Sequence, residues 1–485
     1  MRIKILGALL VAMAACAVAA ATAGAIVTTT PGGGRIGYVP MNQASASSGG
    51  AAPIHSTVPT GEPPLEWHGG PVMHSHAAYA IFWAPSGFSF PAGYTTAIEA
   101  FLENVAADSR KSTNVYSVSA QYTDGTGHAT YSDSFGGSVT DTHSYPTSGT
   151  CAPYTGFFGV EYTKCITDQK MAAEVNTVVT EQSLPRGLGT EYYVVLPPHA
   201  GSCFEATGTE CFDLEYCAYH NYAESANLVY ANISYSPGDV EGCGVGEYPN
   251  GKSNGNVDDT LSSLSHEANE SITDPTLEAW FDEEGFENGD ECRNTPFGED
   301  YGPPLGGSTG SLFNQAIGSG HYYLQQEWSN NIDDCAQRVE AAEPAISGPS
   351  QLAPGQSGNF NGSSSLPGES EIVSYSWKFS DGATASGESV SHAFAATGTF
   401  SVTLTVEDEW GLLYSTTKQV TVAEPAPGGG EGTTTTVSQT SPSPSQQSAG
   451  GGGKALKCRK GFRKAKKHGK AVCVRIKSHH HHHHG

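Results

Sequence analysis

A stretch of fourteen residues, Leu261–Asp274, brings an imidazole and three carboxylates together at helical spacing. On an α-helix its apolar residues fall in one stripe, while the ionisable residues project from the other side. His266 and Glu270 are four residues apart, so both side chains can reach one ion from consecutive turns. Glu267 would lie beside that ion without binding it. The pattern therefore predicts a metal-binding helix with one free carboxylate.

The pattern resembles the His-Glu-x-x-His helix of zinc peptidases, with glutamate in place of the second histidine. In that interpretation His266 and Glu270 bind the ion. Glu267 is the catalytic base, which accepts a proton from the attacking water and passes it to the leaving amine. The plain alternative is a surface helix with one polar face.

A third ligand is needed, and three residues are candidates. We favour Asp290, because it stands in a Gly-Asp-x-Cys motif in which a disulfide at Cys292 could hold the loop rigidly. Glu287 is the second choice, since its spacing from the helix resembles that of peptidases with a glutamate as third ligand. Asp274 is the third choice, because the helix would have to unwind before the following proline to turn it back.

The ligand set leaves the identity of the ion open. One histidine and two carboxylates form a harder site than the usual zinc ligands, so Zn²⁺ is expected but Mn²⁺ or Ca²⁺ would be better tolerated. Acidic residues are dense between Asp282 and Asp300. A structural Ca²⁺ site is therefore a competing prediction.

Two further groups of histidines could take part. His321, in GSGHYYLQQEWSN, is predicted as a second catalytic residue that polarises a carbonyl oxygen; the alternative is a partly buried histidine beside Trp328. His74 and His76 would share one face of a strand, where with His68 they could contribute to a metal site.

The charge of the chain is strongly uneven. The net charge is −25, yet eleven of the 24 Lys and Arg residues lie between Lys454 and Lys477. Such an acidic body disfavours nucleic acid or an anionic membrane as a partner. The basic tail could bind an anionic cell wall or polymer, or it could only solubilise the terminus.

The N-terminal residues 1–25 resemble a secretory signal peptide, with lipid attachment at Cys16 as a minor alternative and no transmembrane span. Ten other cysteines remain, an even number that favours disulfides in an exported protein. We expect local pairing for eight of them: Cys151 with Cys165, Cys203 with Cys211, Cys217 with Cys243, and Cys292 with Cys335.

The segment 26–64 is rich in Gly, Ser and Ala and is predicted to be a flexible leader or propeptide. The domain 65–340 follows, with few strands and long Cys-rich loops, which favours an α+β fold. Strands are expected at 78–84, 115–122, 191–196 and 227–235, and helices at 96–109, 170–182 and 258–274.

Several motifs occur in order across residues 65–338: HGGPVM, AYAIFWAP, EYYVVLPP, SITDP and the Gly-Asp-x-Cys motif. Together they resemble the phosphate-induced, exordium-like family of secreted proteins, and its bacterial branch in particular. The resemblance implies an extracellular protein. It does not by itself imply an enzyme.

Residues 343–424 form a separate unit. Its strands alternate apolar and polar residues, and Trp377, His392 and Phe394 resemble the pattern of a PKD domain, an immunoglobulin-like β-sandwich. His392 belongs to that pattern and is interpreted as structural. A linker at 425–453, the basic tail at 454–477 and a purification tag at 478–485 complete the chain.

Two functions are thus predicted for this multidomain protein. The first is a secreted zinc-type metalloendopeptidase acting on proteins or peptides, with a PKD accessory domain and a basic tail holding it near a wall or polysaccharide surface. The second is a non-catalytic, exordium-like wall or carbohydrate-binding protein with a structural metal site.

Overall fold

The computed structural model describes residues 27–29, 35–41, 64–157, 159–236, 243–292, 301–425, 462–467 and 470–475. The chain divides into two compact units, Met1–Pro425 and Ala426–Gly485. The predicted signal peptide, most of the linker and the tag lie outside the described residues.

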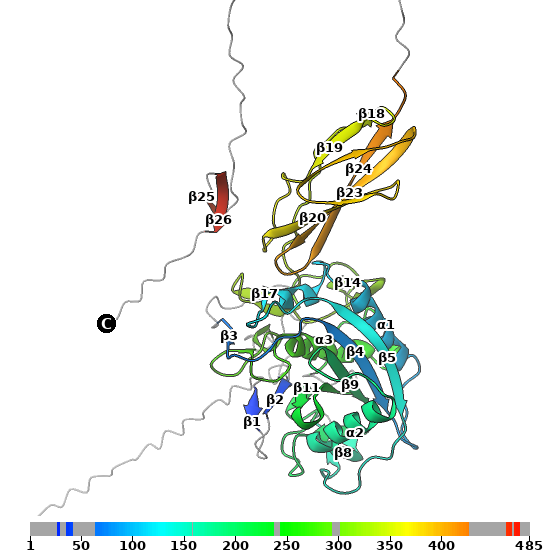
Figure 1. Ribbon diagram of the computed structural model, residues 1–485. Coiled ribbons are helices and arrows are strands. Elements are labelled where there is room, and N and C mark those ends of the chain that lie inside the picture. The colour runs from blue at the N-terminus through cyan, green and yellow to red at the C-terminus, as the bar shows by residue number, and fades with distance from the viewer. Residues whose placement is uncertain are drawn as a thin grey trace, which may run out of the picture. The chain divides into compact units, whose positions relative to one another are not determined.

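A seven-stranded mixed sheet forms the centre of the first domain (Figure 1). Its strands follow the order β1-β2-β11-β12-β9-β4-β5. The last four are parallel to one another, whereas the β1–β2, β2–β11 and β11–β12 pairs are antiparallel. Their bounds are β1 Thr28–Thr29, β2 Arg35–Pro40, β4 His76–Trp83, β5 Asp133–Asp141, β9 Thr190–Leu196, β11 Tyr216–Ala223 and β12 Leu228–Ser234.

Three α-helices cover the two faces of this sheet. α1 (Tyr94–Ala107) and α3 (Val257–Thr273) share one apolar core with alternate residues of β4, β9 and β12, and α2 (Asp168–Glu181) shares a second core with the intervening residues. All seven residues of β9 are buried. A strand covered on both faces is typical of parallel sheets between helix layers, so the mixed α/β layering differs from the expected α+β arrangement.

Within the segment predicted to be a flexible leader or propeptide, residues 35–40 form the strand β2. β2 lies between β1 and β11 near the edge of the sheet, and Ile36 and Val39 are buried. The sequence RIGYVP contains Ile, Tyr and Val, which favour strands, although Gly- and Ser-rich flanks obscure this signal. The remainder of 26–64, apart from 27–29, 41 and 64, lies outside the described residues.

The segment 115–122, expected to be a strand, is a 3-10 helix, η2 (Val115–Gln121). The side chain of Asn114 accepts a hydrogen bond from the backbone N–H of Tyr116, which begins a helical turn at its N-cap. Its alternating apolar and polar residues are nearly all buried together, so the alternation did not reflect a two-sided strand.

Short elements connect the main ones. Strand pairs are β3 (Glu66–Trp67) with β13 (Trp280–Phe281), β8 (Lys164–Thr167) with β10 (Ala200–Cys203), β6 (Tyr154–Thr155) with β7 (Glu161–Tyr162), β14 (Gln315–Ile317) with β15 (Gly320–Tyr322), and β16 (Glu327–Ser329) with β17 (Asp334–Ala336). The other 3-10 helices are η3 (Glu224–Ala226), η4 (Lys252–Asn254) and η5 (Asp290–Cys292).

The four predicted disulfides are confirmed. They join Cys151 to Cys165, Cys203 to Cys211, Cys217 to Cys243, and Cys292 to Cys335. The last of these ties η5 to β17 across 43 residues of sequence. A crosslink of that span restricts the unfolded chain and holds the η5 turn in place.

The second domain is a β-sandwich, as expected. One sheet has the order β18-β24-β23-β20-β21 and the other pairs β19 with β22. The Nε2 atom of His392 lies 2.7 Å from Oδ2 of Asp381, and its ring stacks on Phe379, consistent with a structural role. The bounds are β18 Gln351–Leu352, β19 Ser357–Asn361, β20 Ile372–Phe379, β21 Thr384–Ser386, β22 Ser389–Ala393, β23 Gly398–Asp408 and β24 Leu413–Val422.

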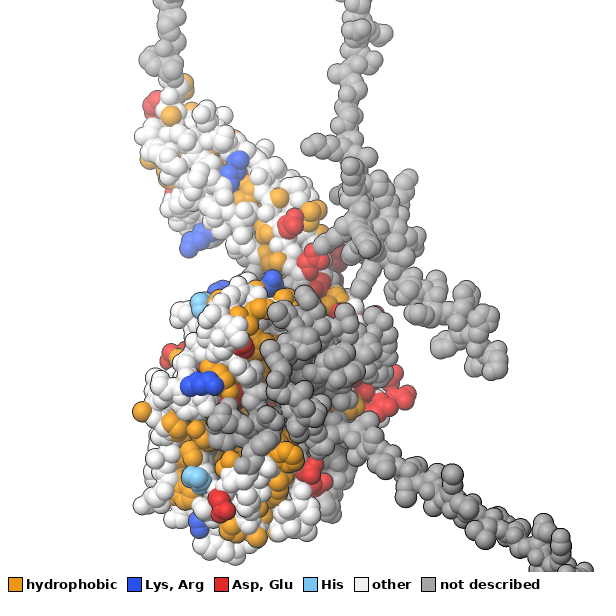
Figure 2. Space-filling model, turned by 180° about the vertical axis from the view of Figure 1, so that it is seen from behind, with side chains coloured by type: hydrophobic (Ala, Val, Ile, Leu, Met, Phe, Trp, Pro, Cys, Tyr) orange, Lys and Arg blue, Asp and Glu red, His pale blue; other side chains and the backbone are white. Residues whose placement is uncertain are grey.

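Within the basic tail, β25 (Phe462–Lys467) and β26 (Lys470–Arg475) form an antiparallel hairpin. None of the described helices is long and apolar enough to cross a bilayer. On the face shown in Figure 2, Lys and Arg side chains are few and scattered, as the acidic composition of the body predicts.

Candidate metal centre

The centre is built on α3, whose residues are all buried. Its apolar stripe belongs to the main core, and the helix also contacts β2, β11 and β12 of the sheet. The helix ends at Thr273 because Pro275 disfavours a helical conformation at Asp274. Burial on every side means that its ionisable residues must find partners inside the protein.

The first cluster contains the three residues favoured from the sequence. Nε2 of His266 lies 2.8 Å from Oε1 of Glu270 and 3.3 Å from Oδ1 of Asp290. One ligand atom from each lies within 4.8 Å of the others, and all three side chains are buried. Asp290 comes from η5, which the Cys292 disulfide anchors. The structure thus brings together the predicted ligand set.

A second cluster lies beside the first and shares Glu270 with it. Nδ1 of His220 is 3.0 Å from Oε2 of Glu267 and 3.6 Å from Oε2 of Glu270. On the other side of the ring, Nε2 is 3.8 Å from Oε1 of Glu287. The side chains of His220, Glu267, Glu270 and Glu287 are completely buried.

His220 was missed by the sequence analysis. It lies on β11, in EYCAYHNYA, and its neighbours Tyr219 and Ala218 are buried as well. A strand buried on both faces does not alternate in polarity, so periodicity offered no signal. The remaining clue was a lone histidine in a tyrosine-rich segment before the hairpin that leads to β12.

The alternative third ligands occupy other positions. Glu287 faces His220 rather than His266. Asp274 accepts hydrogen bonds from the backbone N–H groups of Glu278 and Ala279, at 2.7 and 2.8 Å, and so closes the turn after the helix. A turn aspartate of this kind is a common use of the residue.

The other predicted histidines do not join the centre. His321 is exposed, and its ring stacks on Phe313 with centroids 3.9 Å apart. His74 is largely exposed and pairs with Asp124, whereas His76 is buried at the start of β4. The two histidines therefore do not share one strand face, because the strand begins only at the second.

The pKa values reflect how strongly burial opposes charge here. Burial raises the pKa of Asp290 and Glu287 well above the usual range, and it raises that of Glu267 to about 7. For Glu270, burial acts in the same direction, but the two neighbouring histidines outweigh it and lower the pKa to about 2. Without a bound cation, the two histidines alone would provide too little positive charge to balance the buried carboxylates of both clusters.

Several polar atoms in both clusters are buried without a hydrogen-bond partner. They are Nε2 of His266, Nε2 of His220, Oδ1 of Asp290, and both carboxylate oxygens of Glu270 and Glu287. A lost hydrogen bond to such an atom costs about 1–3 kcal/mol, and more if it is charged. His266 Nε2 and Glu270 Oε1 are only 2.8 Å apart, yet without hydrogen-bond geometry. Convergent, unpartnered nitrogen and carboxylate donors fit a divalent cation.

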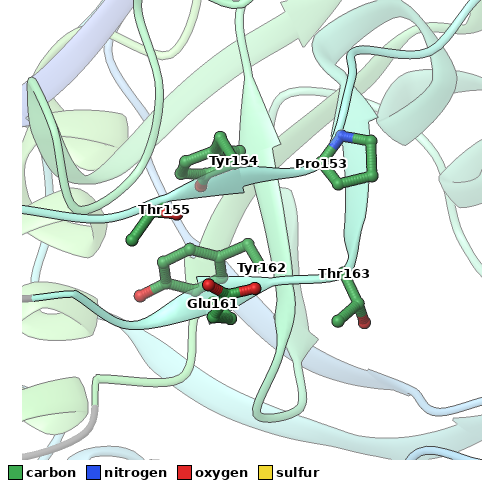
Figure 3. A pocket seen from close by; sticks show the side chains of 6 residues that line it. All are labelled: Pro153, Tyr154, Thr155, Glu161, Tyr162 and Thr163. Carbon is green, nitrogen blue, oxygen red and sulfur yellow. The ribbon is translucent and has the colours of Figure 1, made fainter.

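A separate hollow lies far from these residues in sequence. It has a volume of about 340 Å³ and lies at the β6–β7 hairpin (Figure 3). It is lined by Pro153, Tyr154, Thr155, Glu161, Tyr162 and Thr163. The hydroxyl groups of Tyr154 and Tyr162 donate to Phe212 O and Asp213 Oδ2. None of the lining residues belongs to the metal clusters.

Comparison with known proteins identifies one part of the chain. Residues 340–423 match the PKD domain family; the sequence predicted this unit at 343–424. PKD domains occur often as accessory domains of secreted proteins, including proteases. This part of the chain is thus a PKD domain, and together with the disulfides it is typical of extracellular proteins.

Solved structures of PKD domains are similar to part of the chain. The PKD1 domain of Vibrio anguillarum Epp is 27% identical, covers 18% of this chain and 100% of its own, and has a TM-score of 0.16. The PKD1 domain of the Vibrio cholerae metalloprotease PrtV is 26% identical, with coverages of 17% and 96% and a TM-score of 0.15.

A structure described as carbohydrate-binding modules from the β-sandwich superfamily is 24% identical and has a TM-score of 0.17. This chain spans about a third of its length, since 36% of it is covered, against 18% of this chain.

Proposed function

We propose that this protein is a secreted, metal-dependent peptidase, with zinc as its ion and the PKD domain as an accessory module. The observation that carries the proposal is the convergence of His266, Glu270 and Asp290 around a point where their buried donor atoms have no hydrogen-bond partner. A peptidase centre needs three protein ligands and a nearby base, and Glu267 supplies a carboxylate beside the ligands.

A divalent ion bound there would polarise the scissile carbonyl and make a water molecule more acidic. Glu267 would accept the proton of the attacking water and transfer it to the leaving amine. Its raised pKa, about 7, suits a group that must gain and lose a proton near neutral pH. Nδ1 of His220 is hydrogen-bonded to Oε2 of Glu267 at 3.0 Å, and this contact would fix the orientation of the carboxylate.

Secretion is part of the proposal, and it is supported by four disulfides and by the signal-like N-terminal sequence. The PKD domain and the basic tail would hold the enzyme near a wall or polysaccharide surface. The eleven positive charges between Lys454 and Lys477 suit an anionic polymer.

A second candidate function is favoured by the complete burial of the centre. An ion enclosed by side chains with 0–1% exposure would serve structure rather than catalysis. In that case the ion would be Ca²⁺ or Zn²⁺, and the protein would be a non-catalytic, exordium-like wall or carbohydrate-binding protein. A structural site does not require Glu267 to remain unbound.

The deciding experiment measures casein and gelatin hydrolysis by tag-free wild type and by Glu267→Gln, with and without a chelator. We expect the variant to retain its fold and bound ion but to lose at least about 100-fold in activity, since general bases contribute about 10²–10⁴-fold. The chelator should abolish wild-type activity.

Glu283→Gln is the matched control, because it removes an exposed carboxylate from the same acidic region. It should retain wild-type activity. Equal activity of wild type and Glu267→Gln would reject the proposed base. A wild type that binds the ion but hydrolyses neither substrate would favour the structural function.

A further inference from the structure

We propose that Asp141, His143 and Glu174 form a further metal site, separate from the α3 centre, that binds a divalent transition-metal ion. The ion would join the end of β5, the last strand of the central sheet, to the helix α2. This inference is independent of the proposed function, because none of these residues belongs to the two clusters on α3.

The three side chains bring their ligand atoms together. Nδ1 of His143 lies 2.7 Å from Oε1 of Glu174 and 3.1 Å from Oδ1 of Asp141. One ligand atom from each residue lies within 4.8 Å of the other two. An imidazole nitrogen carries a single N–H or a single lone pair, and one N–H cannot fully satisfy two carboxylates. A divalent ion can take one donor atom from all three residues at once.

A buried, unpartnered oxygen of Asp141 is the second observation. This residue is 3% exposed, and its Oδ2 atom is buried without a hydrogen-bond partner. Its Oδ1 atom accepts a hydrogen bond from the backbone N–H of His143 at 2.8 Å, which holds the carboxylate in place. Burial raises the pKa of both Asp141 and Glu174. A carboxylate that has lost its water needs a hydrogen bond or a cation to remain charged.

The surrounding charge also favours a cation. Glu181 lies two turns after Glu174 on α2, and its Oε2 atom is 3.4 Å from Nε2 of His143. Three carboxylates thus surround one imidazole, so even a protonated ring balances only one of three negative charges. Glu181 also ends α2, where the helix dipole adds partial negative charge, and the last turn of this helix contains no basic residue.

The loop that carries His143 is positioned by other contacts. Nε1 of Trp83 donates to the carbonyl oxygen of His143 at 2.8 Å, and the hydroxyl group of Tyr145 donates to the carbonyl oxygen of Trp83 at 2.8 Å. Tyr145 and Trp83 belong to the apolar core that α2 also joins. Packing therefore holds the strand end and the helix beside each other, so the ligands are preorganised for an ion.

The donor set and its exposure indicate the class of ion. One imidazole nitrogen with two carboxylates suits Zn²⁺ or Mn²⁺, whereas Mg²⁺ and Ca²⁺ prefer oxygen ligands. The side chains of His143 and Glu174 are 44% and 17% exposed, against 1% and 0% for His266 and Glu270. Water can therefore complete the coordination of this ion, and its role would be to crosslink β5 and α2.

The test measures binding of Mn²⁺ to tag-free, full-length protein. Equilibrium dialysis counts the ions per chain in about 0.15 M salt, which screens loose binding to the acidic surface. Wild type should bind one ion more than Glu174→Gln and one more than His143→Gln, whether or not the α3 centre is filled. An excess of Mg²⁺ should not displace this ion. Glu103→Gln, which removes an exposed carboxylate from α1, is the matched control and should bind as many ions as wild type.

Equal numbers of ions in wild type, Glu174→Gln and His143→Gln would overturn this site, and so would displacement by Mg²⁺. Neither result touches the proposed peptidase, which depends on the activity of wild type and Glu267→Gln. Conversely, a wild type that binds the additional ion but hydrolyses neither casein nor gelatin would support this site and overturn the proposed function. Circular dichroism checks the fold of each variant, and if one of the two ligand variants unfolds, the other decides the comparison.

Discussion

Nδ1 of His220 lies 3.0 Å from Oε2 of Glu267, in a hydrogen bond that joins β11 to α3 with both side chains fully buried. The bond orients the candidate base and leaves the other ring nitrogen toward Glu287. One histidine thereby connects the base to the rest of the acidic cluster.

Replacing His220 with glutamine should lower peptide hydrolysis by about 10–100-fold, the usual effect of removing a residue that orients a metal site. The loss should appear mainly in kcat, because the base is misoriented while substrate contacts remain. Steady-state kinetics of tag-free protein measure it. His74→Gln is the control, since His74 is largely exposed and pairs with Asp124; a similar loss in both variants would indicate a general effect of histidine removal.

The Cys292–Cys335 disulfide should matter for metal binding as well as for stability. Cys292 ends the short helix that supplies Asp290, so Cys292→Ser with Cys335→Ser should weaken binding of the proposed ion by at least about tenfold. Competition with a chromophoric chelator measures the affinity.

The matched pair for this comparison is Cys151→Ser with Cys165→Ser, which removes a disulfide outside the metal centre. Both double variants should unfold more easily, each by about 2–5 kcal/mol. Only the first should change metal affinity, and equal affinities would argue against disulfide support of the ligand turn.

Gly289 is expected to tolerate no side chain. A Cβ at this position would lie 2.6 Å from Nδ1 of His266. Gly289→Ala should therefore displace the imidazole and lower the affinity for the ion by at least about tenfold. Gly125→Ala is the control, because a Cβ there meets nothing within 4 Å. Isothermal titration with Zn²⁺ compares the two; unchanged affinity in Gly289→Ala would place the ion away from His266.

A separate prediction concerns pH and a buried histidine in the sheet. His76 lies between Asp133 and Glu191, each 3.0 Å from one ring nitrogen. Burial alone lowers its pKa, but the two carboxylates outweigh this and raise the pKa to about 10. Because the folded pKa is raised, the charged ring stabilises the fold fully below pH of about 6.5, and this contribution is lost as pH rises toward 10.

The free energy of unfolding of wild type should therefore exceed that of His76→Asn most at pH 6, and the difference should shrink by up to about 1.4 kcal/mol per pH unit above 6.5. Urea denaturation at several pH values measures it. A difference that stays constant between pH 6 and 10 would show that His76 is not charged in the folded protein.

The sequence predicted the part of the site that lies within one local pattern. The apolar stripe of the helix and the spacing of His266 and Glu270 identified α3, and the Gly-Asp-x-Cys motif identified Asp290. Periodicity is a local signal, so it reports which face a residue occupies but not what that face meets. The same limit explains the missed partner, because His220 meets the helix only through the packing of α3 on β11.

The fold likewise contains elements that a local sequence pattern predicts and elements that it does not. Helices and the most apolar strands were found within a few residues, since their patterns are strong. β5, with sequence DSFGGSVTD, and β2, with RIGYVP, were not predicted, because each lies at or near the edge of the sheet and is recognised only by its pairing. Edge strands are short of apolar residues, which weakens the signal on which such predictions depend.

The pairing of β2 with β11 has a consequence for maturation. The pairs run from Pro40 opposite Tyr216 to Gly37 opposite His220. A processing enzyme that nicked the chain after residue 41 would produce a peptide still bound to the remainder through main-chain hydrogen bonds, as an added strand is held in other proteins. Cleavage of the chain and release of the peptide would then be separate events, and release would proceed at the rate at which that strand dissociates.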